Sequence, residues 1–358
     1  MSIESKLKKY GKDLVDDLKI TNCLKLKDGY ILKQKNKNNL SSFSQNIGID
    51  KMLNPKLLFD KCKSIIVVAQ KYKLYHSENK KYYAAKNSML IDKDYHITLK
   101  KKLEKISNFL NGFFSNFDYK ICVDTSPLND RLIAQKSGIG RIGKNGFIIS
   151  DKLGSNFNIG YILINKSLKI DKPDKSKCKD SCNRCINSCP TNALTVKGFD
   201  SSKCISELTQ IKRELTYKER ELIGTRIYGC NYCQKSCPDN DVETDNKESI
   251  NLLELINLSN KEYKEKFKNY AFSWRPNSII KRNSIIALGN FEDKELFDKL
   301  SKLLKHPSIK IKKYTLWSLF KSNKNRFLNI DLKNDLLKDE KQKIINYYIK
   351  KGDIDESN

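Results

Sequence analysis

The sequence predicts an α+β protein with an N-terminal α/β domain over residues 1–168, a cysteine-rich domain over 169–248 and an α-helical C-terminal domain over 249–358. Short apolar runs alternate with helical patterns in the first block. Eight of the 11 cysteines fall in the second block, and a helical pattern with basic edges fills the third. A chain of 358 residues with 39% hydrophobic residues is long enough to bury such cores.

The first block combines expected helices with four expected strands. Residues 5–18 and 99–114 have the apolar spacing of helices. The expected strands are the apolar runs 65–69, 121–123, 147–150 and 159–164. No apolar run approaches the ~18 residues that a membrane span needs, and residues 1–16 lack the apolar centre of an export signal. We therefore expect a cytoplasmic protein with no membrane partner.

A glycine-rich segment follows in the same block. Residues 138–143 spell G-x-G-x-x-G, the dinucleotide fingerprint, which must follow a strand and open a helix. Here a helical stretch, 127–136, comes before the glycines and a strand comes after them. The segment therefore predicts a tight loop that approaches something large, and the interleaved Arg141 and Lys144 suit an anionic ligand. A helix C-cap followed by a turn is the alternative.

The cysteines of the first block differ from those of the second. Cys23, Cys62 and Cys122 stand alone beside apolar neighbours and are expected to be buried structural thiols. The other eight form two C-x-x-C-x-x-x-C-P runs, each with one more cysteine upstream. These are Cys182, Cys185 and Cys189 after Cys178, and Cys230, Cys233 and Cys237 after Cys204.

Two such runs are typical of two-cluster ferredoxins, in which the cysteine before the proline ligates the other cluster. The first predicted [4Fe-4S] set is Cys178, Cys182, Cys185 and Cys237, and the second is Cys204, Cys230, Cys233 and Cys189. Two zinc sites or a disulfide knot are the alternatives. The paired C-P endings have no purpose at zinc, and a cytoplasmic chain argues against disulfides. Three residues instead of two separate Cys178 from Cys182.

Histidine is scarce, since the chain has only His76, His96 and His306. A histidine-rich metal centre or Ser-His-Asp machinery is therefore close to excluded. Asp94-x-His96 begins like the signature of proteins that ligate cobalamin through histidine, but Leu99 stands where that signature has glycine. A corrin should not be held in that way.

The net charge of +27 favours a polyanionic partner such as nucleic acid, although a composition biased towards Lys, Asn and Ile explains it equally well. In the third block, residues 281–288 and 312–319 match in character 31 residues apart. Paired helices with a basic edge predict short HEAT-like repeats, which commonly bind something elongated.

Short stretches in a fixed order give the chain a resemblance to a known family. They are Asp94-Tyr95-His96, Val123-Asp124-Thr125, Asp130-Arg131, Gly138-Ile139-Gly140, Gly143-Lys144-Asn145, Cys189-Pro190-Thr191-Asn192-Ala193, Cys204-Ile205-Ser206, Leu208-Thr209, Tyr228-Gly229-Cys230, Cys233-Gln234 and Ser273-Trp274-Arg275. The chain resembles the epoxyqueuosine reductase family, relatives of the cobalamin-dependent reductive dehalogenases. The landmarks run from about residue 90 to 290.

The resemblance implies that the N-terminal domain binds cobalamin without a histidine ligand and that electrons pass to it through two [4Fe-4S] clusters from a low-potential donor. The substrate would be tRNA carrying epoxyqueuosine at the wobble position, and the product queuosine. Asp124 matches the family's proton donor, a role that suits an aspartate whose pKa is raised by an apolar site. An N-cap ahead of Pro127 is the alternative for Asp124. Nothing in the sequence suggests more than a monomer.

The resemblance also implies individual contacts. The expected cofactor-binding residues are Asp124, Ile148, Ile159, Ser206, Asn231 and Tyr232, and the expected substrate-binding residues are Arg131, Arg141 and Lys144. The chain departs from the family pattern at Met52, Arg141, Gly146 and Thr225, and in the loop 82–92. Three other functions stay open: a dicluster electron carrier, a cobalamin reductase of a small halogenated or epoxide substrate, and a non-catalytic tRNA-binding protein.

Overall fold

The computed structural model describes residues 1–27, 39–75, 80–174, 176–243 and 249–353, and the chain divides into two compact units. Unit 1 contains residues 1–75, 93–203 and 231–244, and unit 2 contains 76–92, 204–230 and 245–358. The cysteine-rich block predicted over 169–248 is thus shared between both units. Its middle part belongs to unit 2 because Ile205, Ile223 and Ile227 are buried in that unit's core.

Unit 1 is built on a four-stranded antiparallel sheet in the order β1-β2-β6-β3. The strands are β1 Asp17–Asn22, β2 Ser64–Lys71, β3 Tyr119–Val123 and β6 Phe157–Ile164. The two central strands, β2 and β6, are buried over most of their length, which explains their continuous apolar runs in the sequence. The strands predicted at 65–69, 121–123 and 159–164 are confirmed.

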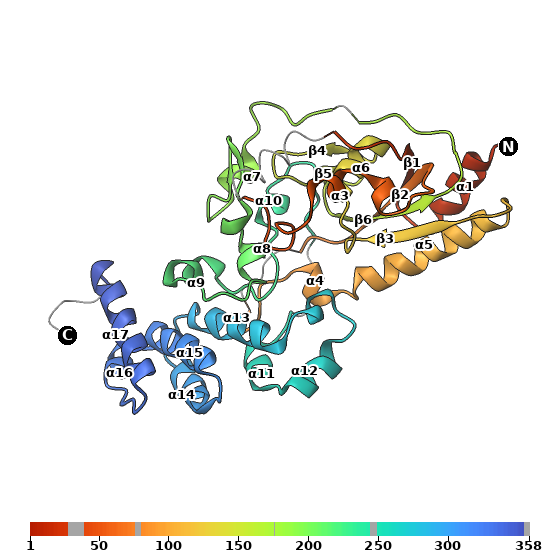
Figure 1. Ribbon diagram of the computed structural model, residues 1–358. Coiled ribbons are helices and arrows are strands. Elements are labelled where there is room, and N and C mark those ends of the chain that lie inside the picture. Colours follow the sequence, from red (N-terminus) through yellow and green to blue (C-terminus); the bar gives the residue numbers. More distant parts are fainter. Residues whose placement is uncertain (28–38, 76–79, 175, 244–248, 354–358) are drawn as a thin grey trace. The chain divides into compact units, whose positions relative to one another are not determined.

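Helices cover both faces of this sheet (Figure 1). Helices α1 Ile3–Lys12 and α5 Tyr95–Asn111 pack on the face that holds Ile66 and Val68. Helix α6 Asp130–Ser137 packs on the opposite face with Ile65 and Val67, because successive side chains of a strand point to opposite sides. The sheet therefore lies between two apolar cores.

Two helix predictions need adjustment. The helix predicted over 99–114 begins earlier, at Tyr95, because the Asp94 side chain caps it. The helix predicted over 5–18 ends at Lys12, and the prediction for its second half was wrong. Leu18 and Ile20 alternate with more exposed residues and pair with β2, so this segment forms β1.

The glycine-rich segment forms a turn and a short hairpin between β4 Arg141–Ile142 and β5 Ile148–Ile149. Gly138 ends α6 with a φ of +86°, which favours glycine, so the predicted helix C-cap is confirmed. A side chain at Gly140 would meet the carbonyl oxygen of Ile149 at 2.3 Å. Glycine at position 140 thus allows the backbone to pass close to the backbone of β5.

The isolated cysteines are buried as predicted, but Cys23 and Cys62 are joined in a disulfide, so of these three only Cys122 is a free thiol. The prediction of three free thiols was therefore wrong for this pair. The sheet brings the two together: Cys23 directly follows β1, and Cys62 lies just before β2, the strand that pairs with β1.

Unit 1 also contains several short elements. They are α3 Ile49–Leu53, η1 Pro55–Leu57, α7 Arg184–Asn187, β7 Leu194–Thr195, β8 Gly198–Phe199, η2 Ser201–Lys203 and α10 Tyr232–Lys235. Helices α7 and α10 carry cysteines of the two C-x-x-C runs.

Unit 2 is helical in its described part. Its helices are α4 Ser88–Ile91, α8 Ile205–Leu208, α9 Tyr217–Ile223, α11 Leu252–Asn257, α12 Asn260–Phe267, η3 Ala271–Trp274, α13 Asn277–Gly289, α14 Leu296–Ser301, η4 Lys302–Lys305, α15 Ile309–Ser322, α16 Lys324–Leu328 and α17 Asp335–Lys350. The matching segments 281–288 and 312–319 lie in α13 and α15. These two helices approach closely, since Ser318 Oγ donates to the Ile285 carbonyl at 2.7 Å.

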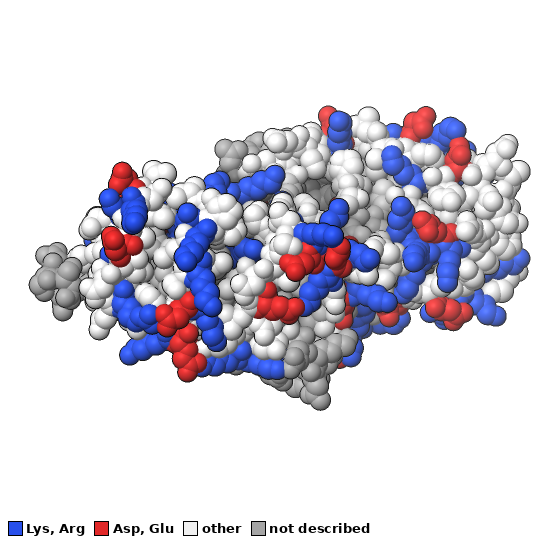
Figure 2. Space-filling model, turned by 90° about the horizontal axis from the view of Figure 1, so that it is seen from below, with Lys and Arg blue, Asp and Glu red and all other residues white. Residues whose placement is uncertain are grey.

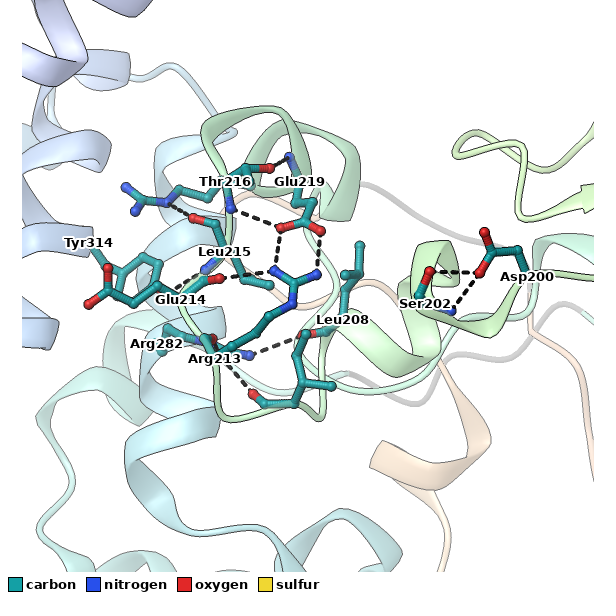
Figure 3. A network of polar contacts seen from close by, with 12 residues as sticks. Asp200, Ser202, Leu208, Arg213, Glu214, Leu215, Thr216, Glu219, Arg282 and Tyr314 are labelled. Carbon is teal, nitrogen blue, oxygen red and sulfur yellow. Dashed lines mark hydrogen bonds and ion pairs between the residues drawn. The ribbon is translucent and has the colours of Figure 1, made fainter. Parts of the chain in front are cut away.

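A polar network joins the segment 204–230 to α13 and α15 (Figure 3). The buried Arg282 guanidinium donates to the carbonyls of Leu208, Ile211 and Arg213. The Tyr314 hydroxyl accepts from the amide of Leu215 at 2.9 Å. Among the described residues, no helix has the length and apolar character needed to cross a bilayer.

Candidate active site

The candidate site lies where β3 ends and α5 begins, within unit 1. Asp124 directly follows β3 and has a φ of +56°, a left-handed conformation that is uncommon outside glycine. Its side chain is 62% exposed, so its carboxylate is open to a bound molecule. The predicted alternative, an N-cap, is not observed, because Asn129 caps α6. A strained aspartate open to solvent is typical of a functional position.

Two neighbouring side chains from α5 hold the Asp124 carboxylate. The Tyr95 hydroxyl donates to Asp124 Oδ2 at 2.7 Å, and His96 Nε2 lies 3.4 Å from the same oxygen. Asp94 holds His96 from the other side, because its Oδ1 accepts from the His96 backbone amide at 2.9 Å and lies 2.7 Å from His96 Nδ1. The Tyr95 and His96 rings stack with centroids 4.1 Å apart. The result is a chain of three groups, Asp94, His96 and Asp124.

The charges of Asp94, His96 and Asp124 oppose the expectation that the pKa of Asp124 is raised. The hydrogen bond from His96 lowers the pKa of Asp124 and outweighs burial, so the expected raised pKa is wrong for this arrangement. Burial disfavours the charged form of His96, but hydrogen bonds and charges of Asp124 and Asp94 prevail and raise its pKa to about 9. At neutral pH the proton therefore resides on His96 and Asp124 is ionised.

A second polar cluster lies beside the first, below the loop that carries Asp124. The buried Tyr161 hydroxyl donates to Asp130 Oδ1 at 2.9 Å and contacts Ser126 Oγ. Burial, aided by the Asp124 charge, raises the pKa of Asp130 to about 7. Tyr95, His96 and Asp130 are among the residues that carry the family resemblance, but the sequence alone predicts no role for them. The signal available was the Asp94-Tyr95-His96 triplet at the start of a helix.

The three basic residues predicted to bind substrate have different surroundings. Arg131 is exposed, and its guanidinium lies 5.2 Å from the centre of the Phe147 ring. Arg141 is nearly buried and is paired with Asp151 and with Asp239. The ammonium of Lys144 donates to the carbonyls of Asp180 and Cys182 at 2.7 and 2.9 Å, and to Asn183 Oδ1.

The predicted cofactor-binding residues fall in both units. Ile148 is buried in β5 and Ile159 is half-buried in β6. Asn231 is buried and the neighbouring Tyr232 is 37% exposed, at the start of α10. These four belong to unit 1, as does Asp124, whereas Ser206 belongs to unit 2. Of these six predicted residues, only Asp124 takes part in the polar contacts with Tyr95 and His96 described above.

Unit 1 gathers the first predicted cluster set. Burial raises the pKa of the Cys185 thiol, and the nearby charges of Cys237, Cys178 and Cys182 raise it further. All four thiols thus lie within electrostatic reach of one another. The two C-x-x-C runs also meet directly, since Ser188 Oγ and Ser236 Oγ are 2.9 Å apart.

Two further observations concern metal binding. Although burial opposes it, hydrogen bonds from Leu194, Thr191 and Ala193 lower the pKa of Cys189, so its thiolate form is stabilised. In the described ranges, no three His, Cys, Asp or Glu side chains converge tightly enough to hold a single ion. A four-iron cluster spaces its thiolates more widely than one ion does. Cys204 and Cys230 belong to unit 2.

Two protein families match this chain. Residues 177–240 match the family described as "4Fe-4S double cluster binding domain". Residues 53–125 match the family described as "Epoxyqueuosine reductase QueG, DUF1730". The first match spans the two C-x-x-C runs, and the second ends one residue after Asp124.

The chain is also similar to curated and solved proteins. It is 35% identical over 313 residues to the epoxyqueuosine reductase of Bacillus subtilis (strain 168), which covers 83% of this chain and 80% of the relative. The structure of epoxyqueuosine reductase from Streptococcus thermophilus superposes with a TM-score of 0.86 at 29% identity, covering 97% of this chain and 100% of that one. A crystal structure of epoxyqueuosine reductase with an epoxyqueuosine-modified tRNA-Tyr stem loop gives a TM-score of 0.84 at 30% identity and covers 96% and 98%.

Proposed function

This chain belongs to the epoxyqueuosine reductase family, and we propose from that premise that it reduces the epoxide of epoxyqueuosine in tRNA to give queuosine. The observation that carries the proposal is Asp124, an exposed carboxylate on left-handed backbone held by Tyr95 and His96. A solved relative from Bacillus subtilis is described with its catalytic aspartate loop swung out of the active site. We assign the same part to Asp124 in the loop after β3.

Asp124 would deliver a proton to the oxygen that leaves the substrate. Opening an epoxide develops negative charge on oxygen, and a carboxyl group within hydrogen-bond reach lowers the barrier by protonating it. Since Asp124 is ionised at neutral pH in the arrangement described here, it must take up a proton before it can act. The groups that contact Asp124, Tyr95 and His96, therefore affect how readily it is protonated.

The residues at the site fit a cobalamin that has no histidine ligand. His96 contacts Asp124, and both of its ring nitrogens already face carboxylates. Within unit 1, the residues that would hold the cofactor are Asp124, Ile148, Ile159, Asn231 and Tyr232. When bound, it supplies reduced cobalt, a strong nucleophile for an epoxide carbon.

Two [4Fe-4S] clusters would supply electrons one at a time. The double-cluster family match and the mutual interactions of Cys178, Cys182, Cys185 and Cys237 support the first ligand set. The spacing of the two runs supports the second set, which is Cys189, Cys204, Cys230 and Cys233. The donor that reduces the clusters would be a low-potential electron carrier.

Arg141 and Lys144 are better suited to holding the cluster loops than to binding tRNA. Lys144 donates to the carbonyl of Cys182, a proposed ligand, and Arg141 pairs with Asp239, two residues after Cys237. Arg131 remains available to an anionic substrate, since its guanidinium is exposed and lies near Asp124.

The helices of unit 2 would bind tRNA as HEAT-like repeats. Lys and Arg side chains outnumber Asp and Glu on the face shown in Figure 2, in keeping with the net charge of +27. Contacts of this kind neutralise phosphates and release counterions, so binding should weaken steeply with added salt. The proposed repeats are represented by α13 and α15, which contain the segments 281–288 and 312–319 that match in character.

Anaerobic turnover tests the proposal. Protein loaded with iron, sulfide and cobalamin is mixed with a strong reductant and epoxyqueuosine-containing tRNA, and the nucleosides are analysed by mass spectrometry. Loss of one oxygen mass is expected, and Asp124→Asn should lower the rate by about 10²–10⁴-fold. Asp118→Asn is the matched control, because it makes the same change at the other end of β3, in an exposed ion pair with Lys61. An unchanged nucleoside from fully loaded wild-type protein would refute the assignment.

A further inference from the structure

The Asp94–His96–Asp124 chain has an order that suits proton transfer. Asp94 Oδ1 lies 2.7 Å from Nδ1 of His96, and Asp124 Oδ2 lies 3.4 Å from Nε2 on the opposite side of the same ring. One carboxylate is half-buried and fixed at the start of α5, with 18% of its side chain exposed, while the other is 62% exposed. The imidazole thus connects a half-buried carboxylate to an open one.

The stoichiometry of the proposed reaction leaves one proton unassigned. Converting an epoxide to an alkene and water consumes two electrons and two protons. The electrons come from the low-potential donor, one C–O bond breaks as the oxygen is first protonated, and the second C–O bond breaks as the oxygen leaves as water. A single carboxyl group holds one proton, so Asp124 can supply both protons only if it is protonated again within the turnover.

We propose that His96 protonates Asp124, and that Asp94 is a positioning residue that keeps Nε2 of His96 directed at the Asp124 carboxylate. The inference rests on the proposed function. In the step itself, the Nε2–H bond of His96 breaks and an O–H bond forms on Asp124 Oδ2. The Asp124 proton passes to the substrate oxygen, and neutral His96 recovers its proton from water.

The geometry around His96 explains why it can take this part. Asp94 also accepts the backbone amide of His96 at 2.9 Å, so its side chain is held in place by the helix start as well as by the ring. A carboxylate on Nδ1 requires the proton on that nitrogen and leaves Nε2 to exchange a proton with Asp124. The 3.4 Å separation is longer than a strong hydrogen bond, which is common before a substrate binds.

The charges that surround His96 agree with this role. Asp94 and Tyr95 face it from α5 and Asp124 faces it from the loop after β3, whereas the charge of Arg131 from α6 favours the ionised form of Asp124. Burial disfavours the charged form of His96, but the carboxylates of Asp124 and Asp94 outweigh it and raise the pKa of His96 to about 9, while the hydrogen bond from His96 lowers the pKa of Asp124. The proton is therefore stored on His96 until the substrate needs it.

Histidine NMR on the loaded protein tests the storage site without turnover. The chain has three histidines, so comparing wild type with His96→Gln and His306→Gln assigns the signals. We expect a His96 pKa near 9 in the wild type and a fall of about 1–3 pH units in Asp94→Asn. The His306 signal should titrate identically in both proteins. A His96 pKa at or below the ordinary 6.5 would overturn the proposal.

The pH profile of a single turnover tests the transfer. Glutamine at position 96 can still hydrogen-bond to Asp124 but cannot release a proton, so His96→Gln should lose about 10²-fold at alkaline pH and regain most of the rate as the pH falls. A purely structural role would lower the rate equally at every pH, and that result would overturn the proposal, as would an unchanged rate. Asp118→Asn serves as the control. If even the wild type fails to act on the tRNA, the proposed function fails, while the NMR titration still reports on His96.

Discussion

Replacing Asn283 by leucine should destabilise unit 2 more than most single substitutions. Asn283 lies on α13 and is fully buried. Its amide group donates to the carbonyls of Thr209 and Ile227, both at 2.7 Å, and its oxygen accepts from Nε of Arg282 at 3.0 Å. Leucine has nearly the same shape but leaves these three buried groups without their partner.

The magnitude follows from those three groups. An unsatisfied buried donor or acceptor costs about 1–3 kcal/mol, so even at the lower end the change should cost about 3 kcal/mol. For a domain of this size that corresponds to a decrease in Tm of about 6–12 °C. The two carbonyls belong to the segment 204–230, which begins with Cys204 and ends with Cys230. Iron content should therefore fall together with stability.

Thermal unfolding followed by circular dichroism, with iron and sulfide analysis of the same samples, checks this prediction. Asn325→Leu on the surface of α16 is the matched control and should melt like the wild type, because residue 325 is exposed. A melting temperature of Asn283→Leu within error of the wild type would show that the buried amide is not what holds the segment 204–230 to α13.

Three further outcomes are expected. Because burial raises the pKa of Asp130 from 3.8 to about 7, its contribution to stability is complete below pH 3.8 and is lost as the pH rises through 7. In urea unfolding, the free energy of unfolding of Asp130→Asn should therefore change less with pH over this range than that of the wild type. Lys144→Met removes three hydrogen bonds to the loop that contains Cys182, so the purified protein should contain less iron, whereas Lys152→Met should not change the iron content. Arg131→Ala should weaken tRNA binding and reduce its salt dependence in a filter-binding assay, and a parallel salt slope would count against a phosphate contact.

Much of unit 1 follows from local patterns. The central strands β2 and β6 were predictable because both faces of each are buried, which leaves continuous apolar runs. β1 was missed because its alternation extends over only six residues and begins a few residues after the end of α1. Only its pairing with β2, more than 40 residues away in the sequence, distinguishes the two structures.

In the candidate site, too, local features could be predicted from the sequence, whereas features that depend on distant residues could not. The position of Asp124 was predictable from a short motif, but its pKa was not, because the shift depends on His96, which precedes it by 28 residues in the sequence. No spacing rule pairs Cys23 with Cys62, which are 39 residues apart. The two C-x-x-C-x-x-x-C-P runs could be predicted to bind clusters, because their cysteines are closely spaced in the sequence. The pairing of ligands and the route of the electrons stay predictions.

The interleaved order of the two units has a consequence for synthesis on the ribosome. Unit 1 is complete once residue 244 has been made, whereas the core of unit 2 needs α13, α15 and α17 from the last third of the chain. Until those helices emerge, Leu208, Ile223 and Ile227 lack most of the apolar core that buries them in the folded unit. A nascent chain at that stage exposes the apolar side chains of the segment 204–230, which lies between Cys204 and Cys230. A ribosome that stalls after residue 250 should therefore leave a product that aggregates or is degraded, even though Asp124 and the rest of unit 1 have already been made.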